Sequence, residues 1–147
     1  MRRVYAVLLD IFAVTFFLGV IGEVLVTFFT VDFLPPMAQW YPAAIPYPVV
    51  LSIHILILIV QSKISLDVSW HTGFFSIPHP RLGKALSWLS LLYLAGTVCQ
   101  YFVTMSLHPE RRWLNGTIPI FFNLVLAVYS FVLGRFLISA EKTLGDQ

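Results

Sequence analysis

The sequence predicts an all-α integral membrane protein, a four-helix antiparallel bundle with both termini in the cytoplasm and with interfacial connecting segments. Three observations predict this class. The 147 residues are 59% hydrophobic and only 11% charged, whereas a soluble domain is about 45–50% apolar and about 25% charged. Four stretches are apolar over a length that can cross a bilayer, and the basic residues are concentrated on one side of them. A soluble domain of this composition would leave large apolar patches exposed.

The first two spans follow from length and from breaker residues. A membrane-spanning helix needs about 20 mostly apolar residues, because the hydrocarbon core is about 30 Å thick and a helix rises about 1.5 Å per residue. The first run begins near Val4 and ends near Phe29, and only Asp10 and Glu23 interrupt it. Five of the nine prolines follow between residues 35 and 48, and each disfavours helix just before it.

The remaining spans have similar boundaries. The second is shorter, with an apolar centre of about twelve residues, and Pro78 and Pro80 precede the third. Pro119 lies in the first turn of the fourth, where its missing N–H is not needed. We therefore expect a single transmembrane domain, residues 1–147, with spans over about residues 4–29, 46–64, 85–107 and 118–140.

Basic residues predict the orientation, because cytoplasmic loops carry an excess of lysine and arginine. With the N-terminus inside, only Arg111 and Arg112 lie outside, where they either pair with Glu110 or contact an extramembrane partner. Arg81 and Lys84 are expected to contact anionic headgroups of the cytoplasmic leaflet. The seven basic residues of the inner side are Arg2, Arg3, Lys63, Arg81, Lys84, Arg135 and Lys142.

The first two connections are rich in aromatic residues, which favour the headgroup region of a membrane. Trp40 lies in the outer connection, residues 30–47, and Trp70 lies in the inner connection, residues 63–83. We expect both segments to lie along the interface. Gln61 and Lys63 are expected to cap the second span at the cytoplasmic surface.

Each span presents one face of polar or small residues at helical spacing. Such faces let helices approach closely and form hydrogen bonds between them, so they predict the seam of the bundle. The four faces are Thr15, Gly19, Gly22 and Val26; His54 and Gln61; Ser90, Tyr93, Thr97, Gln100, Tyr101 and Thr104; and Asn123, Ala127, Ser130 and Gly134.

One candidate site lies in the outer half of the membrane. A buried glutamate must be protonated or paired, and His54 is the one histidine inside a span. We expect a Glu23–His54 pair, with Gln100, Tyr101 and Asn123 completing its hydrogen bonds. Three interpretations stay open: a polar patch that fixes helix register, a pocket for a small molecule, lipid or quinone, and a proton-coupled transport site.

Other chemistry is disfavoured. A haem held between two histidines would need a ligand from a connection, since only His54 lies in a span, and we expect no cofactor. The sequence contains no metal-binding spacing and no catalytic or nucleotide-binding motif, and Cys99 is the single cysteine. Basic residues orient the chain in the membrane, so we expect no nucleic-acid partner. Asp10 lies opposite the seam, where it meets basic residues and headgroups or contacts another subunit.

These observations predict a small polytopic membrane protein. We expect a non-enzymatic accessory or structural subunit of a larger membrane protein complex, surrounded by membrane lipids and other subunits. The alternative is a binding protein, transporter or enzyme for a hydrophobic, lipid-like ligand, with Glu23 and His54 at its site.

Overall fold

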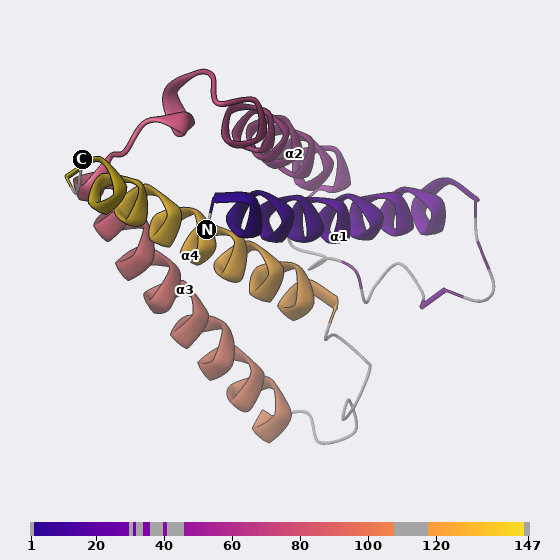
Figure 1. Cartoon of the computed structure of the whole chain (residues 1–147). Coiled ribbons are helices and arrows are strands. Elements are labelled where there is room, and N and C mark those ends of the chain that lie inside the picture. Colours follow the sequence, from indigo (N-terminus) through magenta and orange to yellow (C-terminus); the bar gives the residue numbers. More distant parts are fainter. Residues whose placement is uncertain are drawn as a thin grey trace.

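The structure is a computed structural model. It describes residues 2–29, 31, 34, 35, 40, 46–107 and 118–145, without the side chains of 104 and 140–145. These residues form four long helices and one short 3-10 helix (Figure 1): α1 (Arg2–Phe29), α2 (Tyr47–Trp70), η2 (Phe74–Ser76), α3 (Pro80–Leu107) and α4 (Ile118–Gly145).

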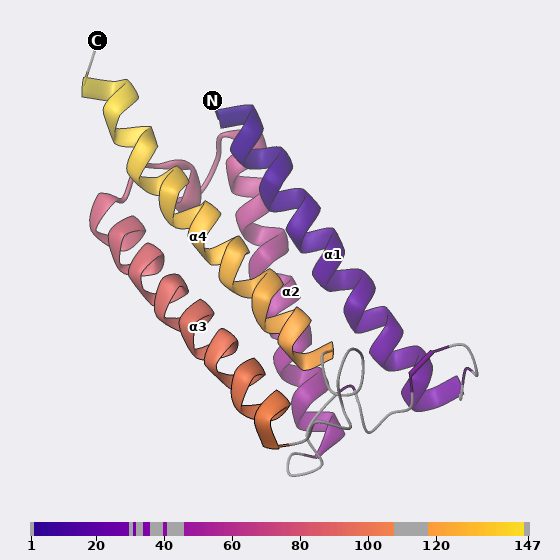
Figure 2. The same ribbon diagram turned by 90° about the horizontal axis from the view of Figure 1, so that it is seen from below.

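Each of the four long helices contains a stretch that is long and apolar enough to cross a membrane. The prediction of an all-helical chain with four such helices is therefore confirmed, and the fold is consistent with a multi-pass membrane protein. The first helical residue of α1 and the last turn of α4 lie at the same end of the molecule (Figure 2).

Helix α4 occupies the centre of the fold. It packs against α3 on one side and against α1 on the other, and α1 also packs against α2 (Figure 1). In the view of Figure 2, α3, α4 and α1 lie side by side with α2 behind them. Among the described residues α2 and α3 have no extended contact, so the fold is open between these two helices.

The inner connection is shorter than expected. The second and third helices were predicted to end near residue 64 and to begin near residue 85, but α2 continues to Trp70 and α3 begins at Pro80. The end of α2 is determined by His71, which has left-handed backbone angles (φ 60°) and donates its N–H to the Asp67 carbonyl. Pro80 suits a first helical position, since its missing N–H is not needed there. The long helices therefore extend into residues 63–83 from both sides and are joined by residues 71–79, while the position of this segment along the interface stays a prediction.

Small residues bring α3 and α4 together. A Cβ atom added to Gly83 would lie 2.7 Å from the Gly134 carbonyl oxygen, and one added to Gly134 would lie 2.6 Å from the Ser87 hydroxyl. Thr97 and Ala127 are also buried along this contact. The predicted polar and small faces of the third and fourth spans thus meet each other, and glycine is required where the backbones are closest.

Two hydrophobic clusters form the core. One lies where α1, α2 and α4 meet towards the inner connection: Leu9, Ile64, Val68, Tyr129, Leu133, Phe136 and Leu137. The other lies beside the candidate site and consists of Phe16, Val20, Phe122 and Val125. Both clusters contain residues of α4, so this helix connects the two parts of the hydrophobic core.

Candidate functional site

The predicted pair of Glu23 and His54 is formed. Nδ1 of His54, on α2, lies 2.7 Å from Oε2 of Glu23, on α1, which is hydrogen-bond distance. The Glu23 side chain is 1% exposed and the His54 side chain 17%. The pair therefore joins two helices through a carboxylate that is almost completely buried.

Aromatic rings surround the histidine. The ring of His54 is stacked on Phe122 of α4, with centroids 5.1 Å apart and an interplanar angle of 11°. Phe16 of α1 meets it edge-on, at 5.6 Å and 87°. These contacts hold the imidazole plane in one orientation, so that Nδ1 is directed at the carboxylate.

Two glycines of α1 provide the space for this packing. A Cβ atom on Gly19 would lie 2.7 Å from the Phe122 ring, and one on Gly22 would lie 2.7 Å from the Trp40 ring. Trp40 also donates its indole N–H to the Pro35 carbonyl, at 2.9 Å. The ring of Trp40 therefore lies against α1 at Gly22, next to Glu23, and its position along the membrane interface stays a prediction.

The pair can hold one shared proton in either of two forms. Ionised Glu23 with protonated His54, and neutral Glu23 with neutral His54, carry the same total charge and differ only in the position of the proton. The second carboxylate oxygen, Oε1, is buried and has no hydrogen-bond partner among the described residues. This oxygen is the part of the pair that can still accept a hydrogen bond or a proton.

Asn123, Gln100 and Tyr101 were expected to complete the hydrogen bonds of the pair. Instead, the Asn123 Oδ1 accepts a hydrogen bond from the Tyr93 hydroxyl of α3, at 2.6 Å. Gln100 and Tyr101 lie on the exposed surface of α3. The reason is the close approach of α3 to α4, which leaves α3 without extended contact to α1 or α2.

Four basic residues were predicted to contact headgroups or a partner protein, and the structure describes two of them. Arg81 and Lys84 are exposed in the first turns of α3, and their contact with headgroups stays a prediction. Arg111 and Arg112 lie outside the described residues.

A second polar centre, which the sequence analysis did not identify, organises the inner connection. Asp67 is 2% exposed; its carboxylate accepts a hydrogen bond from the Lys63 ammonium group and one from the Phe75 N–H, at 3.3 Å. Arg2 of α1 donates to the Val68 and Ser76 carbonyls, at 3.3 and 3.4 Å. The spacing of Lys63 and Asp67, four residues apart on one helix, was the available signal.

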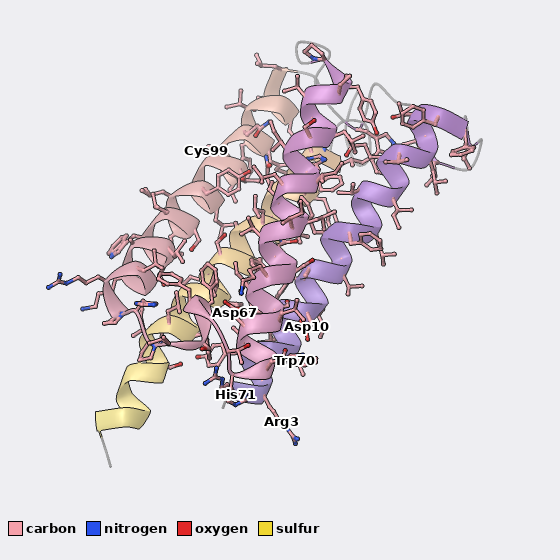
Figure 3. The ribbon with its side chains drawn as sticks, turned by 90° about the horizontal axis from the view of Figure 1, so that it is seen from above. Arg3, Asp10, Asp67, Trp70, His71 and Cys99 are labelled. Carbon is pink, nitrogen blue, oxygen red and sulfur yellow. The ribbon has the colours of Figure 1, made fainter. Side chains whose placement is uncertain are left out.

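Asp10 was expected to meet the headgroups or one of Arg2, Arg3 and Lys63. Lys63 pairs with Asp67 instead, and no ion pair of Asp10 is found among the described residues. Figure 3 shows Asp10 on the α1 side of α2, and Asp67 on the side that faces the inner connection. Both Asp10 and Lys63 line a groove of about 780 Å³ between α1 and α2, which we call the α1–α2 groove.

Gln61 was expected to cap α2 at the cytoplasmic surface, and this prediction is wrong. Its side chain is 2% exposed, because α2 continues for more than two turns beyond it, to Trp70. Neither Nε2 nor Oε1 has a hydrogen-bond partner among the described residues. A buried polar group without a partner costs about 1–3 kcal/mol in proteins, so Gln61 is an unfavourable residue for the chain on its own.

The described residues contain no group of three or more histidine, cysteine, aspartate or glutamate side chains that could hold a metal ion. Cys99 is exposed on α3, and Figure 3 shows it away from the other helices. The expectation that the protein binds neither haem nor another cofactor stays a prediction.

Comparison with known proteins identifies no relative of this chain. No protein-family model, no curated protein and no solved structure matches the chain. Its function is therefore inferred from the geometry above.

Proposed function

We propose that the protein is a non-enzymatic accessory subunit of a larger membrane protein complex. In this proposal the four helices cross the membrane in an antiparallel arrangement with both termini in the cytoplasm, and membrane lipids cover the rest of the apolar surface. The observation that carries the proposal is the exposed side chain of Gln100 within the apolar helix α3.

The argument rests on the cost of polar groups in hydrocarbon. A glutamine side chain offers two donors and one carbonyl acceptor, and leaving them without partners in a membrane is unfavourable. No partner for Gln100 is found in the part of the chain that the structure describes. A polar side chain on a membrane-spanning helix of another subunit would satisfy it, as interhelical hydrogen bonds do in membrane proteins.

The Glu23–His54 pair supports a structural role in the same way. Its members bind each other across α1 and α2, and rings of α1 and α4 enclose the histidine. This arrangement fixes the register of two helices, and a fixed register is what a subunit needs in order to present a constant surface to its neighbours.

Site-specific crosslinking in native membranes tests this proposal. A photoreactive amino acid at Gln100 is expected to crosslink to a different membrane protein, which mass spectrometry identifies. The control is Leu91, which is exposed on α3 and lies on the opposite side of that helix from Gln100, about two and a half turns away; it is expected to label lipid. Crosslinks to lipid alone at both positions, or to a second copy of this chain at Gln100, would contradict the proposal.

A second candidate function is a binding protein, transporter or enzyme for a hydrophobic, lipid-like ligand. The buried Oε1 of Glu23, without a partner among the described residues, favours it. If this function is correct, Glu23→Gln leaves assembly intact and removes lipid-like molecules that copurify in mild detergent, as mass spectrometry would show. If the variant instead loses assembly, the pair is structural and the second candidate fails.

A further inference from the structure

A cavity lies on the open side of the fold, away from the Glu23–His54 pair. Its volume is about 560 Å³, and residues of α2, η2, α3 and α4 line it; we call it the inner cavity. Binding sites for small molecules and cofactors have volumes of about 300–1,000 Å³. The inner cavity is therefore large enough for a ligand, and it lies where α2 and α3 have no extended contact.

The wall of the inner cavity is almost entirely apolar. Leu56 and Val60 of α2 line it together with Leu86 of α3 and Leu126 and Leu133 of α4. None of the described residues that line it carries a charge. The wall therefore favours an uncharged hydrocarbon occupant, because a buried unpaired charge is strongly unfavourable.

The polar residues of this wall are Gln61, Tyr129 and Ser130. The Gln61 side chain is 98% buried, and both its amide nitrogen and its amide oxygen are without partners among the described residues. The Tyr129 hydroxyl, which also lines the cavity, donates instead to the Gln61 backbone carbonyl, at 3.3 Å. The Gln61 carboxamide can thus both donate and accept hydrogen bonds in a largely apolar site, to which Ser130 adds one hydroxyl group.

The shape of the inner cavity distinguishes a lipid from a protein helix. Phe74 and Phe75 of η2 line it beside the inner connection, and Phe74 is stacked on His79, with ring centroids 4.3 Å apart. Along α2 the lining runs from Leu56 to Ile64, which is about 12 Å of helix. A partner helix that crosses the hydrocarbon core needs about 30 Å, so the lined length is too short for one and suits a smaller occupant.

We propose that the inner cavity binds an uncharged, single-chain lipid whose polar group both donates and accepts a hydrogen bond, and that Gln61 recognises this group. A long-chain alcohol has this chemistry. The hydrocarbon chain lies against the leucine-lined wall, and the hydroxyl group bonds to the Gln61 carboxamide. This site is independent of the exposed surface of α3.

Photolabelling of the purified full chain with a diazirine-bearing long-chain alcohol tests the proposal. The label is expected on residues that line the inner cavity, and an unlabelled long-chain alcohol should compete roughly 2- to 12-fold better than the alkane of equal length, the effect of one net hydrogen bond. Gln61→Met keeps a similar side-chain length and removes both hydrogen-bonding groups, so it should abolish this preference while labelling persists. Equal competition by alcohol and alkane in the unmodified protein, or an unchanged preference in Gln61→Met, would overturn the proposal.

A second pair of variants separates the inner cavity from the α1–α2 groove, which Gln61 also lines. Leu126→Trp fills the inner cavity and should abolish labelling. Val14→Trp, in the α1–α2 groove, should leave labelling unchanged, and the opposite result would move the site to that groove. A photoreactive residue at Leu126 in native membranes should crosslink to lipid; crosslinking to another protein would identify a protein occupant and reject the lipid.

Discussion

The imidazole of His54 and the carboxylate of Glu23 form a hydrogen bond of 2.7 Å between α1 and α2, and the glutamate is almost completely buried. This bond and the hydrogen bond from Arg2 to the Val68 carbonyl are the directional interactions between α1 and α2 among the described residues. The two helices cannot slide or rotate relative to one another without breaking them.

Removing one member of this pair should destabilise the fold strongly. We expect Glu23→Ala or His54→Ala to lower the free energy of unfolding by about 3–5 kcal/mol, because each leaves the other polar group buried and unpaired. The double variant should lose less than the sum, with a coupling energy of about 0.5–3 kcal/mol. Thermal and chemical unfolding in detergent measures all three; additive losses would mean that the bond contributes nothing of its own.

The close approach of α3 and α4 predicts a contrast between two glycines. Gly134→Ala should cost about 1–3 kcal/mol, because its Cβ would lie 2.6 Å from the Ser87 hydroxyl and 2.8 Å from the Gly83 carbonyl. Gly96→Ala, on the same pair of helices, should instead stabilise the fold by about 0.5–1 kcal/mol, since nothing lies within 4 Å of its added Cβ. Equal effects at both positions would show that the helices are further apart in solution.

The Asp67 carboxylate should control the order of the inner connection. We expect Asp67→Ala to weaken protection of the amides of residues 71–79 in hydrogen exchange, and to cost about 1–3 kcal/mol, because the Phe75 N–H loses its acceptor. Ser69→Ala, at an exposed position two residues further along α2, is the matched control and should change neither quantity.

Gln61 should be a destabilising residue in the delipidated protein. Gln61→Met removes two buried polar groups without partners among the described residues, so the free energy of unfolding should rise by about 1–3 kcal/mol. Gln100→Met, at an exposed position of α3, should leave it unchanged in detergent. A loss of stability in Gln61→Met would mean that the carboxamide has a partner in solution.

The number of helices and the Glu23–His54 pair could be predicted because each depends on a sequence feature that allows few alternatives. Long apolar runs have few alternatives in a chain with so little charge, and a buried carboxylate has one histidine within the spans as its partner. The position of Gln100 could not be predicted in the same way. Helical periodicity gives the polar face of a helix, but the close contact of Gly83 with Gly134 decides which neighbour that face meets.

The burial of Gln61 depended on a helix end that the sequence obscures. Hydropathy falls after residue 64, where Lys63 and Asp67 suggest a connection. In the structure these two side chains bind each other along α2, and the helix continues to Trp70. The two charged residues that indicated a connection in the sequence are thus paired with each other on a helix.

The central position of α4 has a consequence for biosynthesis. This helix is the last of the four to be made, yet both hydrophobic clusters include its residues. Until α4 leaves the ribosome, α3 has no extended neighbour and α1 has only α2. The nascent chain must therefore keep α3 apart from the α1–α2 pair until α4 joins them, so a ribosome stalled before residue 118 would expose an unassembled intermediate to insertion chaperones and membrane proteases.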